Sequence, residues 1–341
     1  MGTSQQEVGE GPSIDWSVQT KEQCYASLTY PSGDVYTGYM EDGLPSGFGS
    51  LVCVNGDTYR GNWRNGKRCG YGTSTTREEV YTGGWKENMK SGHGVCVYSD
   101  GAYYEGEWVD GERTGLGYGD AADGSTYVGE WMTGQGLCIY PESQYEGGYK
   151  HGRRSGTGVH VDVKGSRYEG EWKDGVKEGQ GTVVGVSGES YEGEWRDNMM
   201  EGEGVFTSGD GSRYEGGWLK GMKNGDGAET DSDGDSYRGE YKDNKMHGRG
   251  VYTYATGEVY EGDMKDGMHH GYGVLTYPSG KRYEGGWKDH KCSGHGVLVS
   301  VDGRRYDGGW RLGLRHGRGT HTDANGVVSE REWENGRRIR R

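Results

Sequence analysis

Nearly the same eight residues recur along this chain, and the repetition constrains the fold more than any other feature. Residues 168–175 read YEGEWKDG, residues 191–198 read YEGEWRDN and residues 283–290 read YEGGWKDH. Thirteen copies follow one another at steps of 23 residues, except for one step of 22 and one of 18. A period in this range is typical of an array in which each repeat packs mainly on its neighbours. The copies begin at Tyr36, Tyr59, Tyr81, Tyr104, Tyr127, Tyr145, Tyr168, Tyr191, Tyr214, Tyr237, Tyr260, Tyr283 and Tyr306.

Residues at alternate positions after the tyrosine predict a strand with one aromatic face. We number positions within a copy from its tyrosine, which is position 0. Position 2 is Gly in all thirteen copies, and ten of the eleven Trp residues stand at position 4, counting Trp333 in a fourteenth copy. Side chains alternate across a strand, so positions 0, 2 and 4 share one face and the charged residues between them share the other. We interpret the glycine as a slot for a neighbouring ring.

A turn is expected at position 7. This position is Gly in ten of the fourteen copies, and the exceptions are Asn88, Asn198, Asn244 and His290. Asn and His are among the few residues besides Gly that tolerate positive φ, so the backbone here is predicted to be left-handed. Two more glycines follow at positions 11 and 13, for example Gly179 and Gly181, and then a short β-branched segment such as 297–299. Each copy is therefore predicted to be one β-hairpin.

The fold class that follows is all-β: an elongated single-sheet array of about 14 stacked antiparallel β-hairpins, roughly 130 Å long at about 4.8 Å per strand. Composition agrees, since Gly (71), Tyr (27) and Trp (11) are abundant and Phe (2) is scarce, which indicates a thin fold stapled by aromatic rings. We expect an N-terminal segment (1–24), partly disordered or a degenerate repeat, then repeats (25–126). A shortened repeat with a possible bend (127–144), further repeats (145–336) and a basic tail (337–341) follow.

The pattern YEGEWKDG followed by G-x-G resembles the membrane occupation and recognition nexus (MORN) repeat, over about residues 25–336. The usual turn His is present only as His247, His270 and His316 among the full-length copies. The resemblance implies a rod, often dimeric, that acts as a cytoskeletal or cortical scaffold, a radial-spoke component of cilia or a membrane-contact protein. It therefore implies cytoskeletal or axonemal partners, a place in the cytoplasm and cytoskeleton, and possibly in the axoneme of a cilium or flagellum.

Charge is unevenly distributed along the chain. From Lys281 onward there are 14 Lys and Arg against 8 Asp and Glu, a net +6, whereas the first 280 residues carry 25 against 45, a net −20. An acidic surface repels nucleic acid and anionic membrane, so no nucleic-acid partner is expected. Only the basic end is a candidate polyanion contact, although a solvated tail is the alternative; its residues are Arg337, Arg338, Arg340 and Arg341. A membrane-peripheral tether that binds anionic phospholipid is thus the second hypothesis, behind the scaffold.

The aromatic face is the candidate protein-binding surface, because aromatic residues dominate interface hot spots and line grooves that hold helices or extended peptides. The alternative is that the rings staple adjacent hairpins and leave nothing free. The candidate residues are Tyr168, Trp172, Tyr191, Trp195, Tyr214, Trp218, Tyr283, Trp287, Tyr306 and Trp310. Self-association, as a homodimer through the C-terminal repeats, is also expected because open sheet ends need covering.

No catalytic residue, metal site or cofactor is expected. Residues 61–68 mimic a phosphate-binding loop, but Arg68 stands where a Ser or Thr would hold magnesium. Residues 231–236 resemble a calcium loop, but Lys242 occupies the place of the bidentate Glu. The repeats also fill nearly the whole sequence, which leaves no room for a catalytic domain. The six Cys residues form no CxxC pair, and the sequence shows no apolar N-terminal signal region and no N-x-S/T site, so a reducing intracellular compartment is expected. No apolar run approaches the roughly 18 residues of a membrane span.

Overall fold

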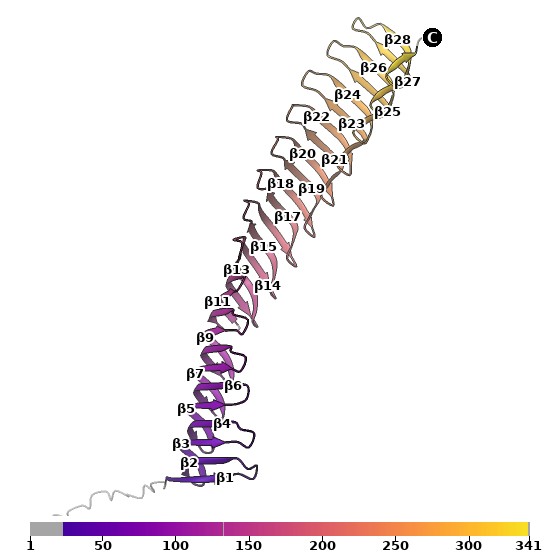
Figure 1. The fold of residues 1–341 in the computed structure, drawn as a ribbon. Coiled ribbons are helices and arrows are strands. Elements are labelled where there is room, and N and C mark those ends of the chain that lie inside the picture. The colour runs from indigo at the N-terminus through magenta and orange to yellow at the C-terminus, as the bar shows by residue number, and fades with distance from the viewer. Residues whose placement is uncertain (1–22, 132, 340–341) are drawn as a thin grey trace, which may run out of the picture. The chain divides into compact units, whose positions relative to one another are not determined.

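The computed structural model describes residues 23–131 and 133–339. Within these ranges the chain forms 29 β-strands and no helix (Figure 1), as the sequence predicts. None of the described residues therefore forms a helix long and apolar enough to cross a membrane. The chain divides into two compact units at Trp131/Met132, inside the shortened copy, and each unit is described by itself. The bend expected at 127–144 stays a prediction, and most of the segment 1–24 lies outside the described residues.

The first unit is an antiparallel sheet in which every strand pairs with the strand that precedes and follows it in the chain. Its strands are β1 (Cys24–Thr29), β2 (Val35–Glu41), β3 (Leu44–Val52), β4 (Thr58–Arg64), β5 (Lys67–Thr75), β6 (Glu79–Lys86), β7 (Met89–Tyr98), β8 (Tyr103–Val109), β9 (Glu112–Asp120) and β10 (Thr126–Glu130). Residues 61–68, which mimic a phosphate loop, comprise the end of β4, the turn at 65–66 and the start of β5.

In the second unit, too, each strand pairs antiparallel with its neighbours in the chain. Its strands are β11 (Thr133–Tyr140), β12 (Ser143–Lys150), β13 (Arg153–Asp162), β14 (Arg167–Lys173), β15 (Val176–Val184), β16 (Ser190–Arg196), β17 (Met199–Thr207), β18 (Arg213–Leu219), β19 (Met222–Thr230), β20 (Ser236–Lys242), β21 (Lys245–Thr253), β22 (Val259–Lys265), β23 (Met268–Thr276), β24 (Arg282–Lys288), β25 (Lys291–Val299), β26 (Arg305–Arg311), β27 (Leu314–Thr322), β28 (Val328–Glu334) and β29 (Arg337–Ile339).

The tight turn of each hairpin confirms the left-handed backbone predicted at position 7. Gly175 has φ of 93°, and Asn198 at the same position has φ of 66°. Position 6 is left-handed as well, which the sequence analysis missed: Asp174 has φ of 50° and Leu312 has φ of 51°. Positive φ at both central residues is the mark of a type I′ turn, whose twist matches that of the flanking strands.

Side chains at position 7 also join consecutive hairpins. The Asn198 N–H donates to the Lys177 carbonyl (3.1 Å), and the Lys177 N–H donates to Asn198 Oδ1 (2.9 Å). Where position 7 is Gly, as at Gly175, only the first of these bonds forms, from its N–H to the Arg154 carbonyl (2.9 Å). Asn therefore supplies both a tolerated left-handed backbone and a second bond to the preceding copy.

The tyrosines and tryptophans form an edge-to-face ladder within each unit, interrupted in the second unit where Met264 stands at position 4. The Tyr168 ring centroid lies 5.2 Å from that of Trp172 in its own copy and 5.3 Å from that of Trp195 in the next, at interplanar angles of 89° and 82°. Such aromatic pairs contribute about 0.5–1.5 kcal/mol each beyond their buried area. The ladder is the core, since nearly all its rings are buried.

The glycines at positions 2 and 13 make room for the tyrosine of their own copy, so the ring that fills the expected slot comes from the same hairpin. A Cβ added to Gly181 would lie 2.4 Å from Tyr168 Oη, and one added to Gly170 would lie 2.6 Å from the same atom. The Tyr168 ring thus lies across its own hairpin, between β14 and β15. Its hydroxyl donates to the Glu171 carbonyl (3.0 Å), beside the register shift between Gly170 and Trp172.

Candidate protein-binding groove

The rings predicted to bind a partner are largely enclosed by one another. Nine of the ten candidate residues have exposed fractions of only 1–8%, and Trp310 is half-buried. Their polar atoms are also occupied: the Trp172 indole N–H, for example, donates to the Gly158 carbonyl of the preceding copy (3.2 Å). The binding role of these rings stays a prediction, and a partner on this face would contact mainly the side chains beside them.

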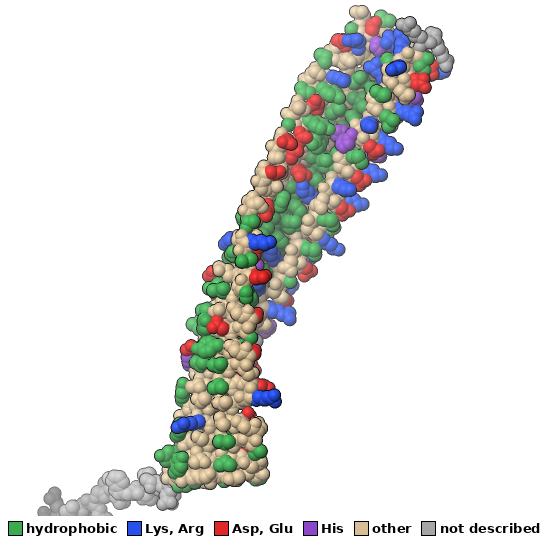
Figure 2. Space-filling view, in the orientation of Figure 1, with side chains coloured by type: hydrophobic (Ala, Val, Ile, Leu, Met, Phe, Trp, Pro, Cys, Tyr) green, Lys and Arg blue, Asp and Glu red, His purple; other side chains and the backbone are tan. Residues whose placement is uncertain are grey.

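Those side chains come from positions 9 and 15 of each copy. Lys177, at position 9, is the cross-strand partner of Trp172, and Val183, at position 15, is the partner of Tyr168. Directly paired residues of an antiparallel sheet lie on the same face, so both positions flank the ladder. We call this surface of the second unit the groove, and Figure 2 shows hydrophobic side chains gathered along a hollow there.

The lining of the groove differs from copy to copy, unlike the ladder beneath it. Position 9 is occupied in turn by Arg154, Lys177, Met200, Lys223, Met246, His269, Cys292 and Arg315. Position 15 is occupied in turn by His160, Val183, Phe206, Glu229, Tyr252, Leu275, Leu298 and His321. Basic, apolar and acidic side chains therefore follow one another in irregular order along one face of the repeated hairpins.

Basic residues at position 9 lie over the aromatic ladder. Lys177 Nζ is 4.5 Å from the Tyr168 ring centroid and 4.7 Å from that of Trp195. Such cation–π contacts are worth about 0.5–2 kcal/mol. The same arrangement recurs at Arg68, Lys90, Arg113, Arg154, Lys223 and Arg315. Sequence reasoning missed this role, although a basic residue two places after the turn in seven copies was a visible signal.

Only some of these cations have an acidic partner. Lys90 Nζ lies 2.5 Å from Glu79 Oε1, and Lys223 Nζ lies 2.5 Å from Glu229 Oε1. Arg154 and Lys177 stand in consecutive copies, and no carboxylate of the described residues lies within ion-pairing distance of either. The groove thus carries two adjacent positive charges, neither of which forms an ion pair with a described residue.

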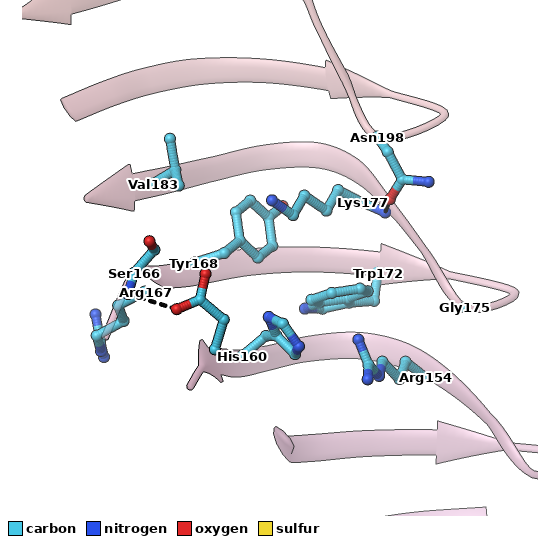
Figure 3. A pocket seen from close by; sticks show the side chains of 11 residues that line it. Arg154, His160, Ser166, Arg167, Tyr168, Trp172, Gly175, Lys177, Val183 and Asn198 are labelled. Atoms are coloured by element: carbon cyan, nitrogen blue, oxygen red, sulfur yellow. Dashed lines mark hydrogen bonds between the residues drawn. The ribbon is translucent and has the colours of Figure 1, made fainter. Parts of the chain in front are cut away.

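These two cations line a pocket of about 300 Å³ on either side of β14 (Figure 3). Arg154 and His160 come from β13 and Lys177 from β15, while Tyr168 and Trp172 lie between them. Burial lowers the pKa of Lys177, and the nearby Arg154 lowers it further. Burial and the same two cations lower the pKa of His160. The pocket is therefore a partly desolvated site of positive potential.

Position 9 of a later copy carries a histidine in place of a cation. His269 stacks on Tyr260, with ring centroids 3.6 Å apart and an interplanar angle of 5°, and its Nε2 lies 3.3 Å from the Tyr254 hydroxyl. Burial, followed by the neighbouring His290, lowers the pKa of His269 to about 4. The imidazole is therefore neutral at pH 7 and part of the packed groove wall.

The remaining sequence predictions fall outside the groove. Arg337 and Arg338 are exposed on β29, and Arg340 and Arg341 lie outside the described residues, so the polyanion contact stays a prediction. The calcium-like segment 231–236 is a turn in which Asp231 Oδ1 accepts the backbone N–H groups of two residues of its own loop (2.9 and 3.0 Å). Within the described ranges no three His, Cys, Asp or Glu side chains gather as metal ligands would.

Tandem hairpins with an aromatic ladder as their core define a β-hairpin repeat protein. A family model described as the MORN repeat matches twelve segments that begin at the same residues as the copies defined above: 36–58, 59–76, 81–103, 104–126, 145–167, 168–190, 191–213, 214–236, 237–259, 260–282, 283–304 and 306–328. The chain therefore belongs to the MORN repeat family, as the sequence pattern predicts. MORN repeats indicate a repeat-based scaffold for protein interaction or membrane association, and no catalytic family is indicated.

A comparison with curated proteins found no match. Among solved structures, the TCP10 domain of Danio rerio CPAP in complex with a peptide of Danio rerio STIL is 13% identical, with a TM-score of 0.22, and the alignment covers 75% of this chain and 99% of that one. A virginiamycin B lyase from Staphylococcus aureus is 10% identical, with a TM-score of 0.14 and coverage of 92% and 89%. TM-scores of this size carry no inference about fold, function or partners.

Proposed function

We propose that the protein is a non-enzymatic scaffold that holds other proteins along its groove in a cytoskeletal assembly, such as the axoneme of a cilium or flagellum or the cortical cytoskeleton. One observation carries the proposal: positions 9 and 15 vary from copy to copy while the tyrosines under them are constant. Because the hairpins are stabilised by their aromatic rings, the residues at positions 9 and 15 can vary and so determine what binds. Such a division is what recognition of specific partners along an array requires.

Detergent extraction of cells that express the tagged chain tests the cytoskeletal context. Signal that remains on a filamentous or axonemal skeleton after extraction supports the scaffold and identifies the structure in which to search for partners. Complete release with the membrane fraction contradicts it. A matched variant with Lys177→Met and Phe206→Ser keeps the ladder and changes the groove lining, so it separates groove-dependent retention from retention through other surfaces.

Self-association through the C-terminal repeats is part of the same proposal. Removing residues 283–341 is expected to convert an oligomer into a monomer, because the last repeats present the open end of the second unit. Mass measured in solution by light scattering checks this, with a chain cut at residue 305 as the control for a shorter deletion. An unchanged oligomer mass after the longer deletion contradicts the assignment to these repeats.

A membrane-peripheral tether is the second candidate, supported by the exposed Arg337 and Arg338 on β29. If it holds, the chain co-sediments with vesicles that contain phosphatidylserine, and changing Arg337, Arg338, Arg340 and Arg341 to Glu abolishes this. Binding that is indifferent to the lipid charge contradicts the tether.

A further inference from the structure

We propose that the pocket formed by Arg154, His160 and Lys177 binds an Asp or Glu side chain of a protein partner, so that the groove recognises an acidic residue followed by apolar ones. The inference rests on the proposed function, because it assumes that the groove binds protein. Nothing in the family match assigns a ligand to this pocket.

The chain itself shows which ligand chemistry fits a lysine at position 9. In the copy that begins at Tyr214, position 15 is Glu229, whose Oε1 lies 2.5 Å from Lys223 Nζ and whose Oε2 accepts the Tyr241 hydroxyl (2.9 Å). In the copy that begins at Tyr168, the corresponding position 15 is Val183, which has no carboxylate to offer Lys177. The hairpin is the same in both copies, but the second lacks the carboxylate and has Trp195 over Lys177 where Tyr241 lies over Lys223.

The acidic residues near the pocket do not supply a carboxylate to Lys177. Asp162, which also lines the pocket, accepts the backbone N–H groups of Lys164 and Ser166 through Oδ1 (2.9 Å each). Arg167, at the rim, is paired with Glu169 (2.6 Å). The positive charges of Arg154 and Lys177 are therefore left over in a partly desolvated site. Bringing a carboxylate to such a site forms charge-assisted hydrogen bonds and relieves the repulsion between two like charges.

Apolar side chains line the next step of the groove. Met200 and Phe206 occupy positions 9 and 15 of the copy that begins at Tyr191, and the Phe206 ring centroid lies 6.2 Å from that of Trp218. One copy spans two strands, so this apolar subsite lies about 10 Å beyond the cationic pocket. A partner with an acidic side chain and an apolar side chain at that separation satisfies both.

A protein carboxylate suits the pocket better than a membrane surface does. The pocket holds about 300 Å³ and is walled by Trp172 and Val183, so it admits one side chain rather than a plane of headgroups. The first 280 residues also carry a net −20 and repel an extended anionic surface.

Selection of peptides from a random 15-residue library on the full-length chain tests the proposal. We expect the selected peptides to be enriched in Asp or Glu at a fixed spacing from a large apolar residue. Changing that Glu to Gln in the best peptide is expected to weaken binding at least tenfold, as measured by fluorescence anisotropy.

Two matched variants locate the effect. Val183→Glu places a carboxylate beside Lys177 as Glu229 stands beside Lys223, and it should weaken the acidic peptide at least tenfold, whereas Val183→Gln should leave its affinity within threefold. Lys177→Met introduces a side chain that the same position already holds in two other copies, Met200 and Met246, and should abolish the preference for Glu over Gln.

The outcomes separate this inference from the function on which it rests. Peptides that bind the groove with no preference for Glu over Gln overturn the carboxylate site and leave the scaffold standing. Failure to select any peptide whose binding depends on groove residues overturns both. Binding to phosphatidylserine vesicles that Lys177→Met abolishes would show that the pocket takes a lipid headgroup, which also overturns the proposal.

Discussion

The glycine at position 13 is expected to be irreplaceable because the tyrosine of its own hairpin lies against it, and Gly204→Ala tests this. The added Cβ would lie 2.4 Å from Tyr191 Oη and 2.6 Å from two ring carbons, Cε2 and Cζ. Carbon atoms in contact prefer separations of about 3.5–4.0 Å, so the ring must move by about 1 Å. It is held on both sides, since the centroids of Trp195 and Trp218 each lie 5.3 Å from it.

The loss of stability in Gly204→Ala can be estimated from these contacts. Overpacking of a tight core costs about 1–3 kcal/mol. A displaced ring also loses its hydroxyl bond to the Glu194 carbonyl (3.0 Å), worth about 1 kcal/mol. We therefore expect the local opening free energy to fall by about 3 kcal/mol, which corresponds to a factor of about 100 at 1.4 kcal/mol per tenfold change. In a repeat array, each copy depends mainly on its neighbours, so the effect should stay local.

Amide hydrogen exchange measured by mass spectrometry is the assay. Segments that cover β16 and β17 should exchange about 100-fold faster in Gly204→Ala, while β24 and β25 should be unchanged. Gly221→Asn is the matched control, because a Cβ at Gly221 meets no atom within 4 Å and Asn198 and Asn244 already stand at the same position. Exchange in β16 and β17 that stays within threefold of the unmodified chain would refute the reasoning that the Tyr191 ring packs tightly against Gly204.

Three further perturbations probe other parts of the frame. Tyr191→Phe should lower the stability of the second unit by about 1 kcal/mol, because the Glu194 carbonyl loses its donor; the urea midpoint measures this. Asn198→Ala should cost about 1–2 kcal/mol through the left-handed backbone and the lost bond to the Lys177 N–H, whereas Asn198→Gly should recover part of it, as thermal unfolding would show. The lowered pKa of His269 means that its neutral form stabilises the fold above pH 6.5 and that this stability is lost as the pH falls from about 6.5 towards 4, by about 1–2 kcal/mol at pH 5. His269→Met should reduce the fall of the urea midpoint between pH 7 and pH 5, to which His160 also contributes, and an unchanged pH dependence would contradict the assignment.

The sequence predicted the frame well because the frame is what repeats. A tyrosine, a glycine and a tryptophan at alternate positions report a shared strand face in every copy, and the Gly, Asn or His at position 7 reports the turn. Two details of the frame were missed. The left-handed backbone at position 6 had a visible signal, because Asp followed by Gly, as at Asp174, is a pair that type I′ turns favour, whereas Leu312 gives no such sign. The contact between Gly181 and Tyr168 depends on how the ring lies over its own hairpin, which the spacing alone does not show.

The candidate site was harder to predict for the opposite reason. The repeat pattern draws attention to the positions that are the same in most copies. These positions are buried, since the Tyr168 and Trp172 side chains are only 1% and 5% exposed. A partner on this face would contact the positions at which the copies differ, such as Lys177 and Lys223 with Val183 and Glu229 beside them. In a repeat protein whose core is one ring thick, constancy indicates packing. The departures from the repeat on the face of the ladder are therefore the proposed determinants of specificity, and Arg154 and Lys177 are cations of consecutive copies that form no ion pair with a described residue.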